Sequence, residues 1–466
     1  MQFDTYIYAI FLAVVFVGYW GLQRRLTLQN LLLLAASYLF YGWWDWRFLG
    51  LIAFTSLTTY GTGLMIRGDR SKSDRLWATL NIVINLGILA AFKYLNFFGE
   101  TAATMMRQLG FTPDWVTLNI VLPVGISFYT FQAISYTIDL YRGDIKPTRN
   151  LLAFMVFIAF FPQLVAGPIE RASNLLPQFL RRKTFDYANA VVGMRQILWG
   201  LVKKIAVADV IGEYVNYCFT NPAAMPASTM ALASLAFGFQ IYADFSGYSD
   251  IAIGSARLFN IKLNVNFRYP YFSRSFRECW RHWHISLTSW FTHYVYFPLG
   301  GSRRGHLRTC FNTMVVFTLS GLWHGASWHF VLWGVLNGLC LLPSVFTPRK
   351  RYTDVPQLRD IPRCIGTALL FIFLFISFRA ASVPHWLGIM KVLLTGDWFV
   401  AQPISPTRLL LIVPLVVAEW LGRRQEFPLQ RLAMPRAVRW AIYWVLLAII
   451  SVSSVGHNVQ YIYFQF

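Results

Sequence analysis

A single histidine stands in the middle of a long run that carries no formal charge. Residues 309–348 contain no Asp, Glu, Lys or Arg, and His324 occurs within them in the stretch SGLWHGASWH. An ionisable side chain in an apolar segment is costly to bury, so it points to function. Imidazole accepts a proton near neutral pH, and burial favours its neutral, basic form. His324 is therefore the candidate general base.

The other interpretation of His324 is a core histidine bonded to a neighbouring carbonyl. The surrounding residues favour the catalytic interpretation, because small side chains leave room for a substrate chain to approach closely. Ser320 and Trp323 lie in the same stretch and are candidates for substrate binding. Asp244, in the apolar stretch 240–256, is a third candidate. The small residues around the histidine are Gly321, Gly325, Ala326 and Ser327.

A second histidine, His284, lies in a segment where aromatic and basic side chains alternate. Residues 276–305 read FRECWRHWHISLTSWFTHYVYFPLGGSRRG. One interpretation of this segment is an amphipathic interfacial helix, with aromatic rings toward lipid and cations toward headgroups. His284 is the exception, because it precedes a less charged run that can turn inward. Arg303 and Arg304 suit the phosphates of a donor, although lipid phosphates would satisfy them equally.

The elements that must position these residues are membrane-spanning helices. Hydrophobic residues make up 56% of the 466 residues and charged residues only 13%, about half the charged share of a soluble domain. A spanning helix needs about 20 mainly apolar residues and satisfies its own backbone in lipid. The sequence predicts an all-α polytopic membrane protein with roughly nine to twelve membrane segments. The uncharged stretches include 5–23, 26–44, 48–66, 76–92, 115–138, 150–169, 214–243 and 440–466.

The formal net charge of +21 comes from basic residues in short loops between apolar segments. A membrane protein places its cytoplasmic Lys and Arg in such loops. The most basic segment, 257–308, holds nine basic residues and one acid. Anionic lipid heads or an anionic soluble donor are the expected partners, and nucleic acid is not. Five widely spaced cysteines without a CxxC pair predict neither a disulfide framework nor a metal site.

One apolar stretch cannot be a regular helix, because residues 161–179 contain three prolines. Non-helical backbone at membrane depth is tolerated inside protein or beside water, so a lined cavity is one interpretation and an ordinary loop is the other. No internal repeat and no separate soluble segment is visible. The sequence therefore predicts one integral membrane domain over residues 1–466, with 257–308 as a polar, mainly cytoplasmic-side segment.

Several motifs extend over almost the whole chain. They are PVGISFYTFQAISY (123–136), FPQLVAGPIERA (161–172), DFSGYSDIAIG (244–254), WRHWHISLTSW (280–290), PLGGSRRG (298–305), SGLWHGASW (320–328), SFRA (377–380) and YIYFQF (461–466). Together these motifs resemble the membrane-bound O-acyltransferase (MBOAT) family, in the bacterial branch that contains the alginate and cellulose O-acetylation membrane proteins. The pair of WHIS and GLWHG carries most of the specificity.

The resemblance implies a fold, a site and partners. The fold would be a bundle of about eleven transmembrane helices with re-entrant and interfacial helices around a funnel or tunnel. The family's catalytic histidine falls on His324, and its second histidine falls on His284. No cofactor would be bound, and acetyl-CoA would be the acyl donor. A periplasmic acetyltransferase or acceptor protein would complete delivery to an exopolysaccharide, and the chain would be multi-pass in a bacterial inner membrane.

These observations predict a membrane-bound O-acetyltransferase that passes acetyl from a cytoplasmic donor across the inner membrane to cellulose or alginate. Two other classes of function stay open. Broken helices and buried polar groups also suit a transporter or flippase of lipid-linked sugars, although no inverted repeat is visible. The third class is a non-catalytic scaffold of a polysaccharide secretion complex.

Overall fold

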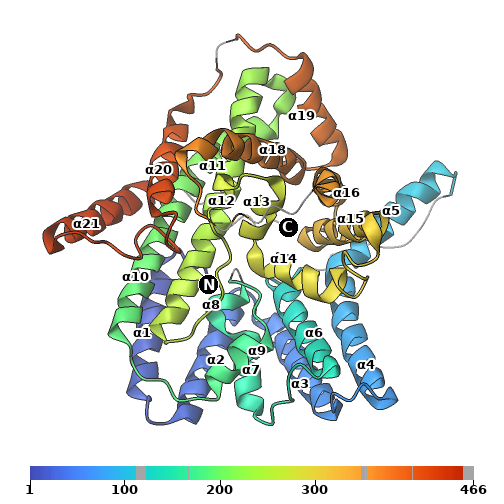
Figure 1. Ribbon diagram of the computed structural model, residues 1–466, viewed down its shortest axis with the longest axis vertical. Coiled ribbons are helices and arrows are strands. Elements are labelled where there is room, and N and C mark those ends of the chain that lie inside the picture. Colours follow the sequence, from blue (N-terminus) through green and yellow to red (C-terminus); the bar gives the residue numbers. More distant parts are fainter. Residues whose placement is uncertain (112–121, 166, 348–351, 353, 401, 455–466) are drawn as a thin grey trace. The chain divides into compact units, whose positions relative to one another are not determined.

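The chain is helical wherever its structure is described. The computed structural model describes residues 1–111, 122–165, 167–347, 352, 354–400 and 402–454, and the regular elements in these ranges are all helices (Figure 1). The predicted all-α class is thus confirmed. Two predictions lie partly or wholly outside the described residues. They are the uncharged stretch 115–138, which is described from residue 122 onward, and the motif YIYFQF at 461–466 with the end of the stretch 440–466.

Five helices among the described residues are long and apolar enough to cross a membrane. Helices α1 and α2 are apolar but shorter. Helix α12, at 32 residues, is long enough to cross, but Asp244, Asp250 and several serines interrupt its apolar character. The multi-pass character is supported, and the number of eleven spanning helices stays a prediction. The five candidate spans are Trp46–Met65, Lys72–Gln108, Trp328–Phe346, Leu358–Arg379 and Arg436–Ser453.

The first of two compact units comprises Met1–Val165, Ile169–Asp186 and Phe259–Leu263. Buried side chains tie its helices together: Asn30 donates to the carbonyl of Phe179 at 2.8 Å, and Thr137 donates to Asn81 Oδ1 at 2.7 Å. Its helices are α1 (Tyr6–Gly21), α2 (Leu26–Gly42), the 3₁₀ turn η1 (Trp46–Phe48), α3 (Leu49–Met65), α4 (Lys72–Leu89), the π-helical turn η2 (Ala90–Tyr94), α5 (Leu95–Gln108), α6 (Ile126–Arg142), α7 (Leu151–Ala159), α8 (Phe161–Leu164) and α9 (Ala172–Phe179).

The stretch 161–179 is broken, as its prolines predict. Helix α7 ends at Ala159, α8 is a single turn, and α9 begins only at Ala172. Phe160, Phe161 and Leu164 are fully buried or nearly so. The irregular backbone therefore lies inside protein, where its polar groups can be satisfied. A lined cavity at this stretch stays a prediction.

The second compact unit comprises Ala166–Pro168, Tyr187–Leu258 and Asn264–Phe466, and it contains all the candidate site residues. Its helices are α10 (Tyr187–Leu201), the π-helical turn η3 (Val202–Asp209), α11 (Val210–Thr220), η4 (Pro222–Ala224), α12 (Ala227–Leu258), η5 (Pro270–Phe272), α13 (Phe276–His282), α14 (Ile285–Phe291), the π-helical turn η6 (Thr292–Tyr296), α15 (Gly305–His324), α16 (Trp328–Leu341), α17 (Pro343–Phe346), η7 (Leu358–Asp360), α18 (Ile361–Arg379), α19 (Val383–Thr395), η8 (Pro406–Leu411), α20 (Ile412–Gly422) and α21 (Arg436–Ser453).

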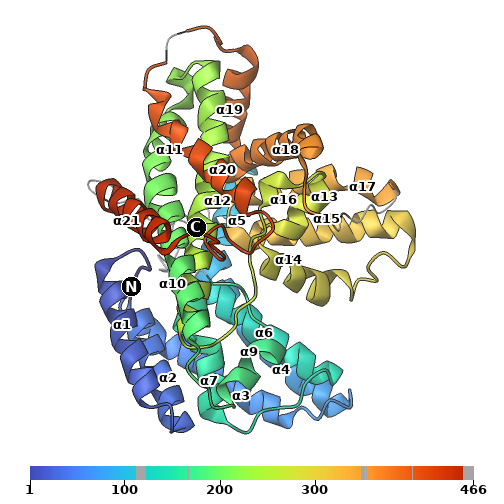
Figure 2. The ribbon, with the colours of Figure 1, turned by 60° about the vertical axis from the view of Figure 1, so that its left-hand side comes forward.

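Glycines bring the backbones of α10 and α12 into direct contact (Figure 2). A Cβ atom added at Gly200 would lie 2.6 Å from the carbonyl oxygen of Gly247, and one added at Gly254 would lie 2.6 Å from the carbonyl oxygen of Gly193. The two pairs run in opposite directions along the chain, so the helices are antiparallel. In lipid the hydrophobic effect does not drive helices together. Small residues at a crossing let the two backbones approach closely enough for van der Waals packing to do so.

The basic residues that interrupt the stretch after α10 are neutralised by acids on α12. Lys203 Nζ lies 2.5 Å from Asp250, and Lys204 Nζ lies 2.9 Å from Asp244 and 2.7 Å from Asp209. Both lysines are buried. A buried ion is tolerated only with a partner of opposite charge, so these pairs fix the register of η3 against α12.

We expect Gly200→Ala to destabilise the protein, because its methyl group has no space against Gly247. Overpacking of this kind costs about 1–3 kcal/mol. Gly366→Ala is the matched control, since Gly366 lies inside α18 with no atom within 4 Å of the added Cβ and a helical Ala is favoured over Gly. Thermal unfolding in detergent, followed by tryptophan fluorescence, measures both. Equal transition temperatures for Gly200→Ala and the wild type would contradict the packing argument.

Candidate active site

His324 is the last residue of α15, and close packing against α16 fixes its position. A Cβ atom at Gly321 would lie 2.2 Å from the carbonyl oxygen of Phe330, and one at Gly334 would lie 2.2 Å from the carbonyl oxygen of Phe317. The two helices therefore meet backbone to backbone one turn before the histidine. The negative end of the α15 dipole lies at His324, where it favours a positive charge on the ring.

The His324 side chain is 5% exposed and is surrounded by aromatic rings. Its ring centroid lies 5.0 Å from that of Trp323, 5.0 Å from that of Trp333 and 5.3 Å from that of Phe378. Aromatic faces carry partial negative charge and attract a cation. The surroundings of His324 thus exclude water, and the C-terminal end of α15 and three aromatic rings lie beside the imidazole.

His284 lies between α13 and α14 in a backbone conformation that few residues adopt. Its φ is +40°, in the left-handed region, which costs free energy in a residue other than glycine. The strain turns the chain sharply, so that the imidazole points inward and is 1% exposed. Its ring packs edge-on against Phe245 at 4.6 Å between centroids. The inward turn predicted for His284 is what the structure shows.

Asn266 determines which nitrogen of His284 carries the proton. His284 Nδ1 lies 3.1 Å from Asn266 Oδ1, and the same oxygen accepts from the hydroxyl of Ser286 at 2.9 Å and from its N–H at 3.4 Å. Asn266 Nδ2 donates to Ser249 Oγ at 3.1 Å. These donors fix the amide with its oxygen toward the histidine, so Nδ1 carries the hydrogen and Nε2 keeps its lone pair.

The other nitrogen of this imidazole is left without a protein partner. His284 Nε2 is buried and has no hydrogen-bond partner in the described part of the chain. His284 lies outside the five candidate spans, and burial lowers its pKa, which keeps the ring neutral. A buried polar atom without a partner requires an explanation, and a substrate hydroxyl is one group that would satisfy it.

Trp323 lies between the two histidines. Its ring centroid is 6.0 Å from that of His284 and 5.0 Å from that of His324. Two elements far apart in the sequence thus bring both candidate catalytic residues to the same indole ring. The structure assembles His284, Trp323 and His324 into one buried cluster.

A cavity of about 720 Å³ lies next to this cluster. Ser320, one turn before His324, is part of its wall, as is Trp280, whose ring lies 5.8 Å from that of Trp333. Threonines and apolar side chains form most of the remainder, and basic side chains line one part of it. The polar and basic lining residues are Arg277, Arg281, Thr288, Thr292, Ser302, His306, Thr309, Thr313 and Ser344. This volume is that of a small-molecule site.

The remaining candidate site residues lie in two different places. Arg303 and Arg304 are exposed and stand between Ser302 and Gly305, which line the cavity. Asp244 is buried in its ion pair with Lys204 and does not join the histidine cluster.

The interpretation of 276–305 as one interfacial helix with aromatic rings toward lipid is wrong. The segment folds as α13, α14 and η6, and Trp280, Trp283 and Trp290 are each buried to better than nine-tenths. The rings pack inward because the left-handed turn at His284 reverses the face that the chain presents.

Sequence reasoning missed Asn266 and most of the cavity wall. An asparagine in the stretch NVNF carries no recognisable pattern. Its role becomes visible only when residues 266 and 284–286 are brought together, through the backbone hydrogen bond from Ile285 to the carbonyl of Asn266 at 2.9 Å.

Comparison with known proteins places this arrangement in a family. The family model described as MBOAT, membrane-bound O-acyltransferase, matches residues 146–380. The chain is 37% identical over 447 residues to the "Probable alginate O-acetylase AlgI" of Azotobacter vinelandii, covering 94% of this chain and 88% of that protein. It is 36% identical over 450 residues to the protein of the same name from Pseudomonas aeruginosa, covering 94% and 84%.

A third relative is named for a different polymer. The chain is 32% identical over 414 residues to the "Peptidoglycan O-acetyltransferase" of Helicobacter pylori, which covers 82% of this chain and 77% of that protein. The matched range 146–380 contains both histidines, Asn266 and the cavity. The chain therefore belongs to the membrane-bound O-acyltransferase family and is an O-acyltransferase.

Proposed function

We propose that this protein transfers acetyl from a cytoplasmic thioester donor, acetyl-CoA, to a hydroxyl acceptor for O-acetylation of an envelope polysaccharide such as alginate or cellulose. The observation that carries the proposal is the pair of buried imidazoles on one indole, beside a cavity that contains Ser320 in its wall. The names of the relatives support acetyl as the group and a polysaccharide as the final acceptor.

The chemical step needs a base for the hydroxyl and an acid for the leaving group. In the proposal the acceptor oxygen attacks the thioester carbonyl while its proton moves to His324. The carbon–sulfur bond breaks, and the thiolate takes that proton from the imidazolium to leave as a free thiol. The C-terminal dipole of α15 and the rings of Trp323 and Trp333 stabilise the transient positive charge.

His284 fits a positioning role toward the hydroxyl. With its hydrogen on Nδ1 and its lone pair on Nε2, the neutral ring can accept a hydrogen bond but cannot donate one to a developing oxyanion. Stabilising an oxyanion is thus a less suitable role for this ring. The inward nitrogen would instead hold the acceptor hydroxyl in line for attack.

The cavity suits the donor. Its apolar and threonine-lined wall can shelter the uncharged arm of a thioester, while Arg277, Arg281 and the neighbouring Arg303 and Arg304 supply positive charge for phosphates. We further propose residence in a bacterial inner membrane, with a periplasmic acetyltransferase or acceptor protein completing delivery to the polymer. Ser320 and Trp323 would contact the reacting group.

His324→Ala should lower acetyl transfer by about 10²–10⁴-fold, because a positioned general base contributes that much. Turnover is measured with the purified protein, labelled acetyl-CoA and an acceptor polysaccharide or its carrier. His385→Ala, which removes a histidine on α19 whose Nδ1 accepts from the N–H of Ala381, is the control and should keep its activity. Near-normal transfer by a folded His324→Ala protein would eliminate the mechanism.

Asn266 should act through the protonation state of His284. Asn266→Ala removes the oriented acceptor and should slow transfer about tenfold, the value of one hydrogen bond. Asn266→Asp places a carboxylate beside Nδ1, which raises the pKa of the imidazole. The basic form is then lost at a higher pH, so the acid limb of the pH–rate profile should move upward in Asn266→Asp only. Identical acid limbs in the two variants would refute the tautomer argument.

Reversal of charge at Arg303 and Arg304 to Glu should raise the KM for acetyl-CoA by about tenfold with little change in kcat, because uniform binding is lost. The matched control reverses Arg181 and Arg182, two exposed arginines of the first unit. An unchanged KM in the first double variant would exclude these residues from donor binding.

A further inference from the structure

A second cavity, of about 460 Å³, lies in the same unit and is lined by arginines. Three separate segments contribute to it: residues 268–282, Tyr352 with residues 354–356, and residues 423–431. Its side chains are mainly polar or charged, in contrast to the apolar and threonine-rich wall of the first cavity. The basic groups are Arg268, His282, Arg423, Arg424 and Arg431.

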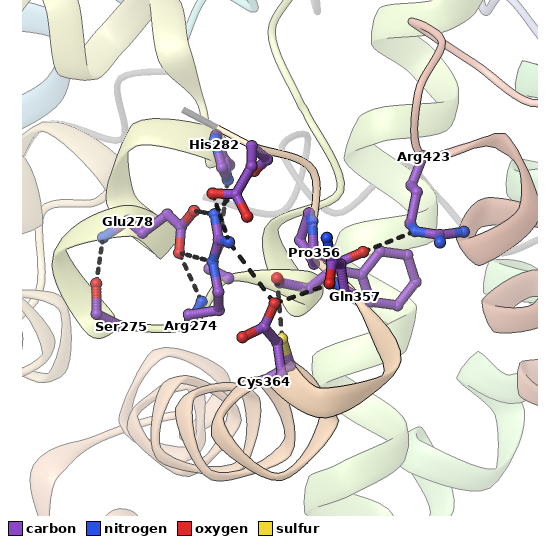
Figure 3. A network of polar contacts seen from close by, with 12 residues as sticks. Arg274, Ser275, Glu278, His282, Pro356, Gln357, Cys364 and Arg423 are labelled. Carbon is purple, nitrogen blue, oxygen red and sulfur yellow. Dashed lines mark hydrogen bonds and ion pairs between the residues drawn. The ribbon is translucent and has the colours of Figure 1, made fainter. Parts of the chain in front are cut away.

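The acids in this wall are paired with arginines outside it. Glu278 lies 3.0 Å from Arg274 (Figure 3), and Asp354 lies 3.1 Å from the same guanidinium. Glu426 pairs with Arg257. Neither Arg274 nor Arg257 belongs to the lining of the cavity. The single charge of Arg274 is shared between two of these carboxylates, but the four lining arginines still outnumber the three lining carboxylates, so the wall keeps an excess of positive charge.

One of the four lining arginines is a fixed part of the wall. Arg423 Nε donates to the carbonyl of Pro356 at 2.9 Å (Figure 3). Its guanidinium stacks on the ring of Trp420 at 4.2 Å. The side chains of Arg268, Arg424 and Arg431 make no ion pair or hydrogen bond within the described residues. Three guanidinium groups thus face one space with their donors unused.

A buried histidine lies beside these arginines. The pKa of His282 is lowered first by burial; Glu278 opposes this effect, and Arg268, Arg274 and Arg281 lower the pKa further. His282 Nδ1 lies 3.1 Å from Ser273 Oγ, which holds the ring in place at the edge of the cavity.

We propose that this arginine-lined cavity binds a phosphate-bearing ligand. The planar guanidinium matches two phosphate oxygens at once, and three free guanidiniums suit a group with more than one negative charge. The volume falls in the range of small-molecule sites. Two sources carry this chemistry: the nucleotide phosphates of a soluble donor, and the headgroup of an anionic lipid.

The cavity is built on the segments that orient His284. The N–H of Arg268 donates to the carbonyl of His282 at 3.0 Å, and the N–H of Ile285 donates to the carbonyl of Asn266 at 2.9 Å. The two pairs lie next to each other along the chain. A ligand on Arg268 thus contacts the scaffold that sets the tautomer of the histidine.

Binding measurements on the full-length protein in phosphatidylcholine nanodiscs test the proposal. One arm titrates adenosine 3′,5′-bisphosphate by calorimetry, and the other arm measures retention of phosphatidylglycerol by native mass spectrometry. The variant carries Arg268→Gln, Arg424→Gln and Arg431→Gln. The control removes three exposed arginines of the first unit, with Arg24→Gln, Arg25→Gln and Arg181→Gln.

We expect binding in one arm to weaken at least about tenfold in the cavity variant, since charged hydrogen bonds are lost, and to change less than about twofold in the control. Loss in the nucleotide arm identifies a donor phosphate, and loss in the lipid arm identifies a headgroup. Unchanged binding in both arms, or equal loss in the control, overturns the proposal. Should the triple variant not fold, Arg424→Gln alone is tested the same way. The readout is binding, so it can fail while the acetyl-transfer proposal stands.

Discussion

The hydrogen bond between Asn266 and the Nδ1 of His284 is the contact on which the site depends. It spans 3.1 Å between two fully buried groups, and the N–H and hydroxyl of Ser286 fix the amide that makes it. The consequence appears on the far side of the ring, where Nε2 holds a lone pair without a protein partner. This nitrogen is one of several buried polar atoms in the described residues that have no protein partner, and in the proposal a substrate hydroxyl satisfies it. The left-handed turn at His284 is the conformational cost of aiming it inward.

Close helix contact supplies the rigidity that such a site needs. Backbone meets backbone where Gly321 and Gly334 bring α15 to α16, and again where Gly200 and Gly247 bring α10 to α12. These contacts prevent α15 from sliding along α16 and α10 from sliding along α12. The position of the C-terminal end of α15 is therefore fixed. The buried ion pairs of Lys203 with Asp250 and of Lys204 with Asp244 also fix the register of η3 along α12. Asp244 therefore serves the frame that surrounds the site.

The sequence alone predicted the helical class, and it singled out His324 because an uncharged run that contains an imidazole is a local signal. The assignment of His284 came from the family resemblance. The sequence also predicted the break at 161–179, since proline acts on its own helix. It could not predict Asn266 or the cavities, because these arise where segments far apart in the chain meet. The aromatic rings of 276–290 illustrate the same limit. Alternating Trp and Arg resemble an interfacial helix, but one positive φ at residue 284 turns Trp280, Trp283 and Trp290 into the core.

The two cavities differ in the charge of their walls, and a thioester donor would require both an apolar and a positively charged site. The larger one, beside Ser320, is mostly apolar and threonine-lined, so a carbonyl there reacts in a low dielectric where oriented dipoles act strongly. The smaller one collects guanidinium groups that outnumber the carboxylates of its wall. Had the arginines lined the larger cavity in the same number, their field would oppose the build-up of positive charge on His324 during proton transfer. In the proposal the larger cavity, with Arg277 and Arg281 in its wall, carries less of this charge than the smaller one, which leaves the imidazole beside it basic.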